Sequence, residues 1–197
     1  MARDPPSSGA SPSSGVAPGA RRGLGQLRWL ALTGALIGID QWSKHLVESS
    51  LSLYEARYYL PVFNLVRAHN QGAAFSMLAG ASGWQRWAFS ALAVAVSGAL
   101  VVWLASLERR AQLLAAALAL ILGGALGNLI DRLRLGYVVD FLQVHWHAHY
   151  FPAFNVADSA ITVGAAILLL DALLNSRSGG GSSGRGSNSG NSSSGGA

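Results

Sequence analysis

Four aspartates lie in or beside long apolar stretches of the chain: Asp40, Asp131, Asp140 and Asp158. A carboxylate at the centre of a membrane helix costs about 2.5–3.5 kcal/mol by insertion scales, and less near the interface. Two carboxylates that share one proton can hydrolyse a peptide bond, because the ionised group activates water while the neutral group polarises the carbonyl. These residue types therefore allow acid–base hydrolysis if the fold brings two of them together.

The spacing Asn-x-x-Asp occurs twice, in two different settings. Asn155 and Asp158 open an apolar run, where an amide and a first-turn acid cap a helix N-terminus. Asn128 and Asp131 close an apolar run, where the acid faces the negative end of the helix dipole, so capping does not explain it. A network of Asp131 with the adjacent Arg132 that braces this helix end would be a purely structural explanation.

The other two aspartates also have local explanations. Asp40 and Lys44 have the i, i+4 spacing of an ordinary helix ion pair. Asp140 stands among large apolar residues in "YVVDF", where a carboxylate needs a partner or a raised pKa. From the residues alone, both Asp131 and Asp140 are candidates to share a proton with Asp158; the apolar neighbours of Asp140 favour it.

Three histidines alternate in "VHWHAHY": His145, His147 and His149. On one strand they would share a face that could bind a metal. The favoured interpretation is the wetted face of an edge strand beside lipid headgroups, with Trp146 and Tyr150 as interfacial aromatics.

The composition is that of a membrane protein. The 197 residues are 51% hydrophobic and 12% charged, whereas soluble domains carry about 25% charged residues. The absence of cysteine excludes disulfides, thiolate metal sites and cysteine nucleophiles. The net charge of +5 comes from scattered basic residues without a basic patch, so no nucleic-acid partner is expected.

The apolar segments predict an all-α membrane protein, a four-transmembrane-helix bundle with a small β element on its outer face. Each span is close to the roughly 20 residues that cross a bilayer, and two further segments are rich in aromatic and β-branched residues or alternate as strands do. The expected spans are residues 29–46, 87–107, 111–130 and 155–174, and the expected strand segments are 58–70 and 136–151. Residues 1–26 and 176–197 are expected to be disordered tails around a membrane domain at 27–175.

The charge bias predicts that both termini are cytoplasmic. This topology places eight Lys and Arg residues inside and six outside. A set of polar residues then lies at the outer end of the bundle. A local explanation exists for each of them, but none explains why they occur together. The set is Asp40, Lys44, His45, Asn70, Asn128, Asp131, Arg132, Asp140, Asn155 and Asp158.

Five motifs occur in order along the chain: "DQWSK" (40–44), "NQGAAF" (70–75), "GGALGNLIDR" (123–132), "VVDF" (138–141) and "FNVADSAI" (154–161). Over residues 29–174 the sequence resembles the lipoprotein signal peptidases, also called signal peptidase II. The resemblance implies a four-helix aspartic endopeptidase of the bacterial inner membrane, with a β-cradle and the active site near the extracytoplasmic face. Such enzymes remove the signal peptide of a prolipoprotein, cutting before a cysteine that carries diacylglycerol.

By this resemblance Asp140 and Asp158 match the catalytic aspartates. The other family positions around the site match Asp40, Lys44, Asn70, Gly72, Asn128, Asp131, Arg132, Asn155 and Ala157. The expected partners are prolipoproteins with a diacylglyceryl-Cys and membrane lipids, the enzyme is expected to be a monomer, and no metal or organic cofactor is needed.

The alternative function is a small proton-coupled transporter or channel subunit, in which intramembrane acids form a proton relay. A relay needs acids through the membrane thickness, whereas here they cluster at one end and Asp171 alone stands at the far end of its span. A purely structural membrane protein is the third possibility.

Overall fold

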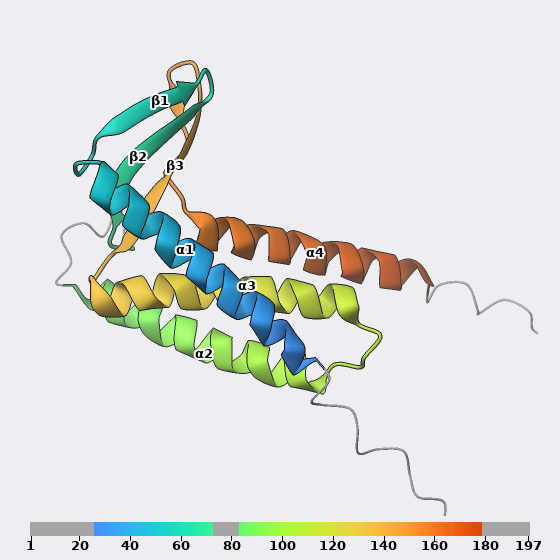
Figure 1. Ribbon diagram of the computed structural model, residues 1–197. Coiled ribbons are helices and arrows are strands. Elements are labelled where there is room, and N and C mark those ends of the chain that lie inside the picture. The colour runs from blue at the N-terminus through green and yellow to red at the C-terminus, as the bar shows by residue number, and fades with distance from the viewer. Residues whose placement is uncertain (1–25, 73–82, 179–197) are drawn as a thin grey trace, which may run out of the picture.

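The computed structural model describes residues 26–72 and 83–178. Four long helices run beside one another, and a small sheet stands at one end of them (Figure 1). The elements in chain order are a 3-10 helix (Leu27–Trp29), α1 (Leu30–Ser50), β1 (Ala56–Leu60), β2 (Phe63–Asn70), α2 (Trp84–Ser106), α3 (Gln112–Arg134), β3 (Val138–Trp146), β4 (His149–Tyr150) and α4 (Val156–Ser178).

The tails predicted from composition lie almost wholly outside the described residues. The described structure includes a few residues next to the membrane domain that were assigned to these tails. Gln26 is fully buried and donates from Nε2 to the Glu108 carbonyl, and α4 continues to Ser178. A buried glutamine with a backbone partner is held in place, and the domain bounds of 27–175 stay a prediction.

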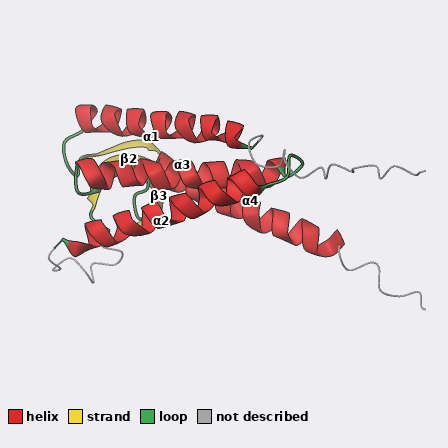
Figure 2. Cartoon of the chain, turned by 90° about the horizontal axis from the view of Figure 1, so that it is seen from below, coloured by secondary structure: helices red, strands yellow, loops and turns green. Residues whose placement is uncertain are grey.

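Helix α3 is the centre of the bundle, and it packs against α1, α2 and α4. In Figure 2 it runs between α1 and α2. Glycines allow its neighbours to approach closely. A Cβ at Gly124 would lie 2.3 Å from the Ala157 carbonyl oxygen of α4, and one at Gly127 would lie 2.8 Å from the Asp40 carboxylate of α1. Side chains at these positions would push both neighbouring helices away.

Three helices are long and apolar enough to cross a membrane: α2, α3 and residues Val156–Leu174 of α4. Helices α2 and α4 expose large apolar side chains, for example Val102 and Leu169, as helices facing lipid do. Helix α1 falls outside this set because its second half carries Asp40, Lys44 and other polar residues. Three of the four predicted spans are thus helices of sufficient length and hydropathy to cross a membrane. That α1 also crosses stays a prediction.

The sheet is antiparallel, in the order β1-β2-β3-β4. The strand-like segment 58–70 is a hairpin rather than a single strand, since β1 ends at Leu60 and β2 begins at Phe63, with Pro61 in the turn. Proline lacks the N–H that a strand interior needs. The pairing of β2 with β3 places Ala68 opposite Asp140.

The three histidines do not share one strand face. His147 lies in the turn between β3 and β4 with φ of 52°, and His149 has already crossed to β4. Within the described ranges, no three His, Cys, Asp or Glu side chains form a group that could hold a metal ion. The geometry assumed for a histidine metal site is therefore wrong.

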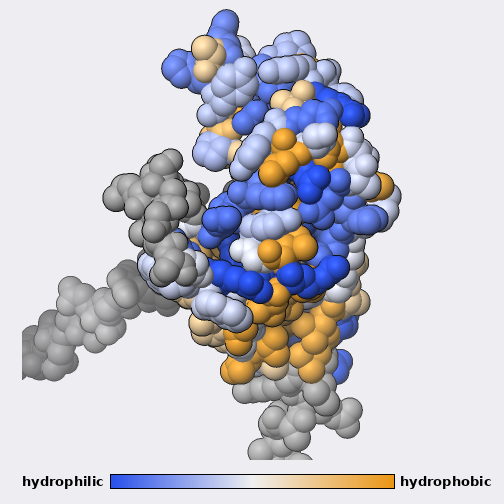
Figure 3. Space-filling view, turned by 90° about the vertical axis from the view of Figure 1, so that its left-hand side faces the viewer, coloured by the Kyte–Doolittle hydropathy of each residue, from blue (hydrophilic) through white to orange (hydrophobic). Residues whose placement is uncertain are grey.

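The start of α4 contacts the middle of α1, the last turns of α3 and the start of β3, at the side of the bundle that carries the sheet (Figure 1). Figure 3 looks onto this side, where hydrophilic residues occupy the middle and upper parts of the face and hydrophobic residues the lower part. The predicted polar residues gather there.

Candidate functional site

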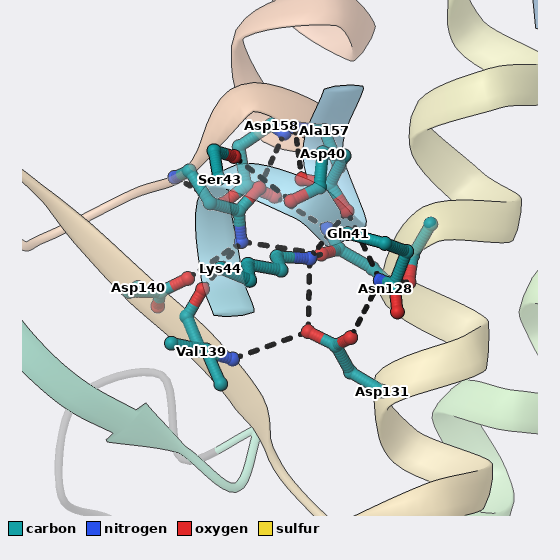
Figure 4. A network of polar contacts seen from close by, with 12 residues as sticks. Asp40, Gln41, Ser43, Lys44, Asn128, Asp131, Val139, Asp140, Ala157 and Asp158 are labelled. Carbon is teal, nitrogen blue, oxygen red and sulfur yellow. Dashed lines mark hydrogen bonds and ion pairs between the residues drawn. The ribbon is translucent and has the colours of Figure 1, made fainter. Parts of the chain in front are cut away.

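A buried lysine links α1 to α3. The Lys44 Nζ lies 2.7 Å from Asp40 Oδ2 and 2.8 Å from Asp131 Oδ2, and it donates to Asn128 Oδ1 over 3.0 Å (Figure 4). Lys44, Asp40 and Asp131 are all 3% exposed or less. The i, i+4 pair predicted for Asp40 and Lys44 is confirmed. Each of these buried charged groups therefore has a partner of opposite charge, and the Asn128 amide adds a hydrogen bond.

Asp131 pairs with Lys44 rather than with its sequence neighbour Arg132, so the predicted Asp131–Arg132 network is wrong. Its other contacts are one more donor from α1, Gln41 Nε2 at 2.7 Å from Oδ1, and one from β3, the Val139 N–H at 3.2 Å from Oδ2. Both oxygens of Asp131 thus have partners on α1 or β3, and none of these contacts joins Asp131 to Asp158.

Asp140 on β3 is held by two amides. The Asn155 Nδ2 donates to Oδ1 over 2.7 Å and the Asn70 Nδ2 donates to Oδ2 over 3.0 Å. Both donors are neutral, and Asp140 is 3% exposed. The carboxyl is thus oriented without a direct ion pair among the described residues.

Asp158 lies in the first turn of α4, where it forms a capping box with Asn155. The Asn155 Oδ1 accepts from the Asp158 N–H over 2.9 Å, and Asp158 Oδ2 accepts from the Asn155 N–H over 3.3 Å. The predicted cap is confirmed. The remaining oxygen, Oδ1, accepts from Asn128 Nδ2 over 2.7 Å.

Asn155 therefore contacts both carboxyl groups, through its side chain to Asp140 and its backbone to Asp158. The pKa of Asp140 is raised from 3.8 to about 7, mainly by burial and in addition by the negative charge of nearby Asp158. The hydrogen bonds from Asn70 and Asn155 act in the opposite direction and lower it. At neutral pH such a group can carry or release a proton.

Asp40 has a second role besides its pair with Lys44. Its Oδ1 accepts from the N–H of Ala157, which is fully buried at the start of α4. Asp40 thus fixes the residue that precedes Asp158. Because Gly124 and Gly127 of α3 pack against the same place, the position of Ala157 has room for a small side chain only.

Asn70 closes a turn at the end of β2. Its Oδ1 accepts from the Gly72 N–H over 2.8 Å, so one side chain fixes both this turn and Asp140. Gly72 has φ of +87°, which a glycine adopts without strain, and the Phe89 ring occupies the space where a side chain would begin.

The Arg132 guanidinium lies over the Phe89 ring, 5.4 Å from its centroid, and donates to the Asn128 carbonyl over 3.4 Å. His45, predicted among the clustered polar residues, is instead exposed on α1. Gln41 and Phe89 also contact residues of the site, although neither was among the candidates predicted from the sequence. Only the position of Gln41 inside the "DQWSK" motif indicated that it could belong to the site.

The fold and the site define a class of protein: a helical membrane protein with an enclosed polar site built around two neighbouring carboxyl groups. Comparison with known families makes the assignment specific. The model of the signal peptidase (SPase) II family matches residues 32–174, and the chain belongs to this family.

Named relatives agree with this assignment. The lipoprotein signal peptidase of Pseudomonas syringae pv. tomato is 56% identical over 158 residues, which cover 79% of this chain and 91% of the relative. That of Pseudomonas aeruginosa PAO1 is 53% identical over 158 residues, covering 79% and 94%. The resemblance inferred from the motifs is confirmed.

Two solved structures, each described as a bacterial membrane enzyme, share the fold. One has a TM-score of 0.71 at 24% identity and covers 83% of this chain and 98% of the other. The second has a TM-score of 0.68 at 26% identity, with coverage of 79% and 98%. The arrangement of helices and sheet is therefore that of a known membrane enzyme.

Proposed function

We propose that this chain is an aspartic endopeptidase in which Asp140 and Asp158 hydrolyse the peptide bond before a diacylglyceryl-modified cysteine. Membership of the signal peptidase II family makes it a protease that removes signal peptides from prolipoproteins. The observation that carries the catalytic assignment is the contrast among the partners of the four acids at the site. Asp40 and Asp131 both form an ion pair with Lys44, whereas neutral amides hold Asp140 and Asp158.

In the proposed reaction Asp158 is the base. It lies in the first turn of α4, where the helix dipole stabilises negative charge. Asp158 takes a proton from water, the water oxygen attacks the scissile carbonyl carbon, and neutral Asp140 gives its proton to the carbonyl oxygen. Collapse of the tetrahedral intermediate breaks the C–N bond, the proton on Asp158 passes to the leaving amine, and one hydroxyl proton of the gem-diol returns to Asp140, which restores the starting state of the pair.

The supporting residues then orient this pair. Asn155 and Asn128 fix the two carboxyl groups, and Asn70 fixes Asp140 from the opposite side. The backbone beside Gly72, at the end of β2, would meet the substrate chain, and the acyl chains would lie against the apolar helices. This chemistry uses protons and carboxyl groups, so it requires neither a metal nor an organic cofactor.

The proposed location is the bacterial inner membrane, with four crossings that include α1, cytoplasmic termini and the site near the outer face. The chain order supports this topology, since α1 and α3 end where α2 and α4 begin. The count of eight inner against six outer basic residues supports the same orientation. We take the membrane domain as residues 27–175 and the working unit as a monomer.

The test is incubation of the purified protein with a prolipoprotein in two forms, with and without diacylglycerol on the cysteine. We expect cleavage of the modified form only, with mass spectrometry placing the lipid-modified cysteine at the new N-terminus. Equal cleavage of both forms would contradict the proposed substrate class. Proton-coupled flux in liposomes without any cleavage would favour a transporter instead.

A further inference from the structure

Helix α2 contributes an aromatic residue rather than a polar one to the site. Phe89 lies in the second turn of α2 and is 36% exposed. The polar contacts around Asp140 and Asp158 come from β2, β3, α3 and α4. Phe89 touches this network at two separate points.

The first point is the turn that ends β2. The Phe89 Cε2 lies 2.6 Å from where a Cβ at Gly72 would stand, so the ring fills the space of the missing side chain. The Gly72 N–H donates to Asn70, and Asn70 donates to Asp140. The ring thus packs directly against the turn that holds a proposed catalytic carboxyl.

The second point is Arg132. Its guanidinium lies 5.4 Å from the Phe89 ring centroid, within the range of a cation–π contact. It forms no ion pair within the described part of the chain, yet the charges of Asp158, Asp140 and Asp131 act on it. An arginine side chain has many rotamers, and a ring beneath its planar head restricts them.

From these two contacts we infer that Phe89 is a positioning residue for the aspartate pair. It fixes the distance of the Arg132 charge from Asp140 and Asp158, and it supports the Asn70–Gly72 turn. This inference rests on the proposed role of the two aspartates. It assigns a function in catalysis to α2, a helix that otherwise faces lipid with most of its large side chains.

The consequence concerns the protonation of Asp140. A nearby guanidinium favours the ionised form of a carboxyl, so its displacement raises the carboxyl pKa. The other charged groups around the pair are Asp40 and Lys44 of α1 and Asp131 of α3; Arg86 of α2 is directed to the Leu133 carbonyl. The partners of these groups are other residues than Phe89, so removal of the ring leaves their ion pairs and hydrogen bonds intact.

The experiment compares Phe89→Leu, Phe89→Met and Phe89→Tyr in detergent micelles. The Leu and Met variants keep apolar volume without a π face, whereas the Tyr variant keeps the ring. The pKa of Asp140 is followed by carbon NMR of protein labelled at the aspartate carboxyl carbons, which requires no turnover, and cleavage of the lipid-modified precursor is followed against pH.

We expect the Leu and Met variants to raise the Asp140 pKa and shift the pH–rate profile by about half a unit to higher pH. Their kcat/KM should fall about three- to tenfold, and Phe89→Tyr should retain both properties. In an Arg132→Gln background, Phe89→Leu should shift the pKa less, because only the support of the Asn70–Gly72 turn is then lost.

Trp87→Leu is the matched control, because Trp87 lies two residues earlier on α2 and stacks with Arg86 at 4.9 Å. The inference is overturned if Phe89→Leu and Phe89→Met leave the Asp140 pKa unchanged, if Trp87→Leu shifts it equally, or if the shift is as large in the Arg132→Gln background as in the wild type. Retained cleavage by Asp140→Asn or Asp158→Asn would instead overturn the proposed function, so the two failures are distinguishable.

Discussion

The side-chain amide of Asn155 donates a 2.7 Å hydrogen bond to Asp140, and so the residue that caps α4 also holds the carboxyl of a strand. The same Asn155 contacts Asp158 through its backbone N–H. One residue therefore sets the relative position of the two groups on which the proposed chemistry depends.

The two roles of Asn155 can be separated by substitution. Serine caps a helix about as well as asparagine but has no amide to donate to Asp140. We expect Asn155→Ser and Asn155→Ala to lower cleavage about 3- to 10-fold, the effect of losing a hydrogen bond between neutral groups. Only the Ala variant should also lose about 1 kcal/mol of unfolding free energy from the missing cap. Wild-type cleavage by Asn155→Ser would contradict the role of the amide.

Stability should depend on pH through Asp140. Its pKa is raised to about 7 in the folded protein, compared with about 3.9 in an unfolded chain. The stabilisation from the protonated form is complete below about pH 4 and is lost as the pH rises through 7. We expect the melting temperature to fall between pH 5 and pH 8 in the wild type, and to fall less in Asp140→Asn. The measurement is thermal unfolding in detergent; equal slopes for the two proteins would refute the expectation.

Lys44 should be essential for folding. Lys44→Met leaves Asp40 and Asp131 buried without their cation, and breaking a buried pair in this way costs about 3–5 kcal/mol. Adding Asp40→Asn and Asp131→Asn should recover much of the loss. Arg57→Met is the matched control, because its ion pair with Glu55 is largely exposed and should contribute about 0–1 kcal/mol. The measurement is the unfolding midpoint in detergent, and equal effects of the two substitutions would contradict the assigned burial of charge.

The contact between α3 and α4 should be sensitive to one methyl group. Gly124→Ala would place a Cβ 2.3 Å from the Ala157 carbonyl oxygen, which forces α4 to move and costs about 1–3 kcal/mol. Cleavage should fall as well, because Asp158 moves with α4. In Gly98→Ala of α2 the new Cβ meets no atom within 4 Å, and alanine favours a helix by about 1 kcal/mol. Thermal unfolding of the two variants checks this, and a Gly124→Ala protein as stable as Gly98→Ala would refute the packing argument.

Much of this arrangement follows from local patterns in the sequence. The start of α4 at Asn155 was predictable because a capping box involves residues three apart. The apolar spans placed α2, α3 and α4 to within a few residues. The convergence of polar residues at one end follows from the alternation of helix direction.

The partners of the buried acids were not predictable from local spacing. Adjacent residues on a helix point about 100° apart, so Asp131 and Arg132 face different neighbours. Asp131 instead meets Lys44 and Gln41, which lie on α1 far away in the sequence. Phe89 has no polar atom, and only the packing of α2 against β2 and α3 assigns it to the site.

The most direct test of the central claim is single-turnover cleavage of a diacylglyceryl-modified prolipoprotein by Asp140→Asn and Asp158→Asn, with Asp171→Asn at the far end of α4 as control. The account predicts that the first two variants fold and bind the precursor but release no signal peptide, while the control cleaves at the wild-type rate. Cleavage by either Asp140→Asn or Asp158→Asn at a rate near wild type would contradict it.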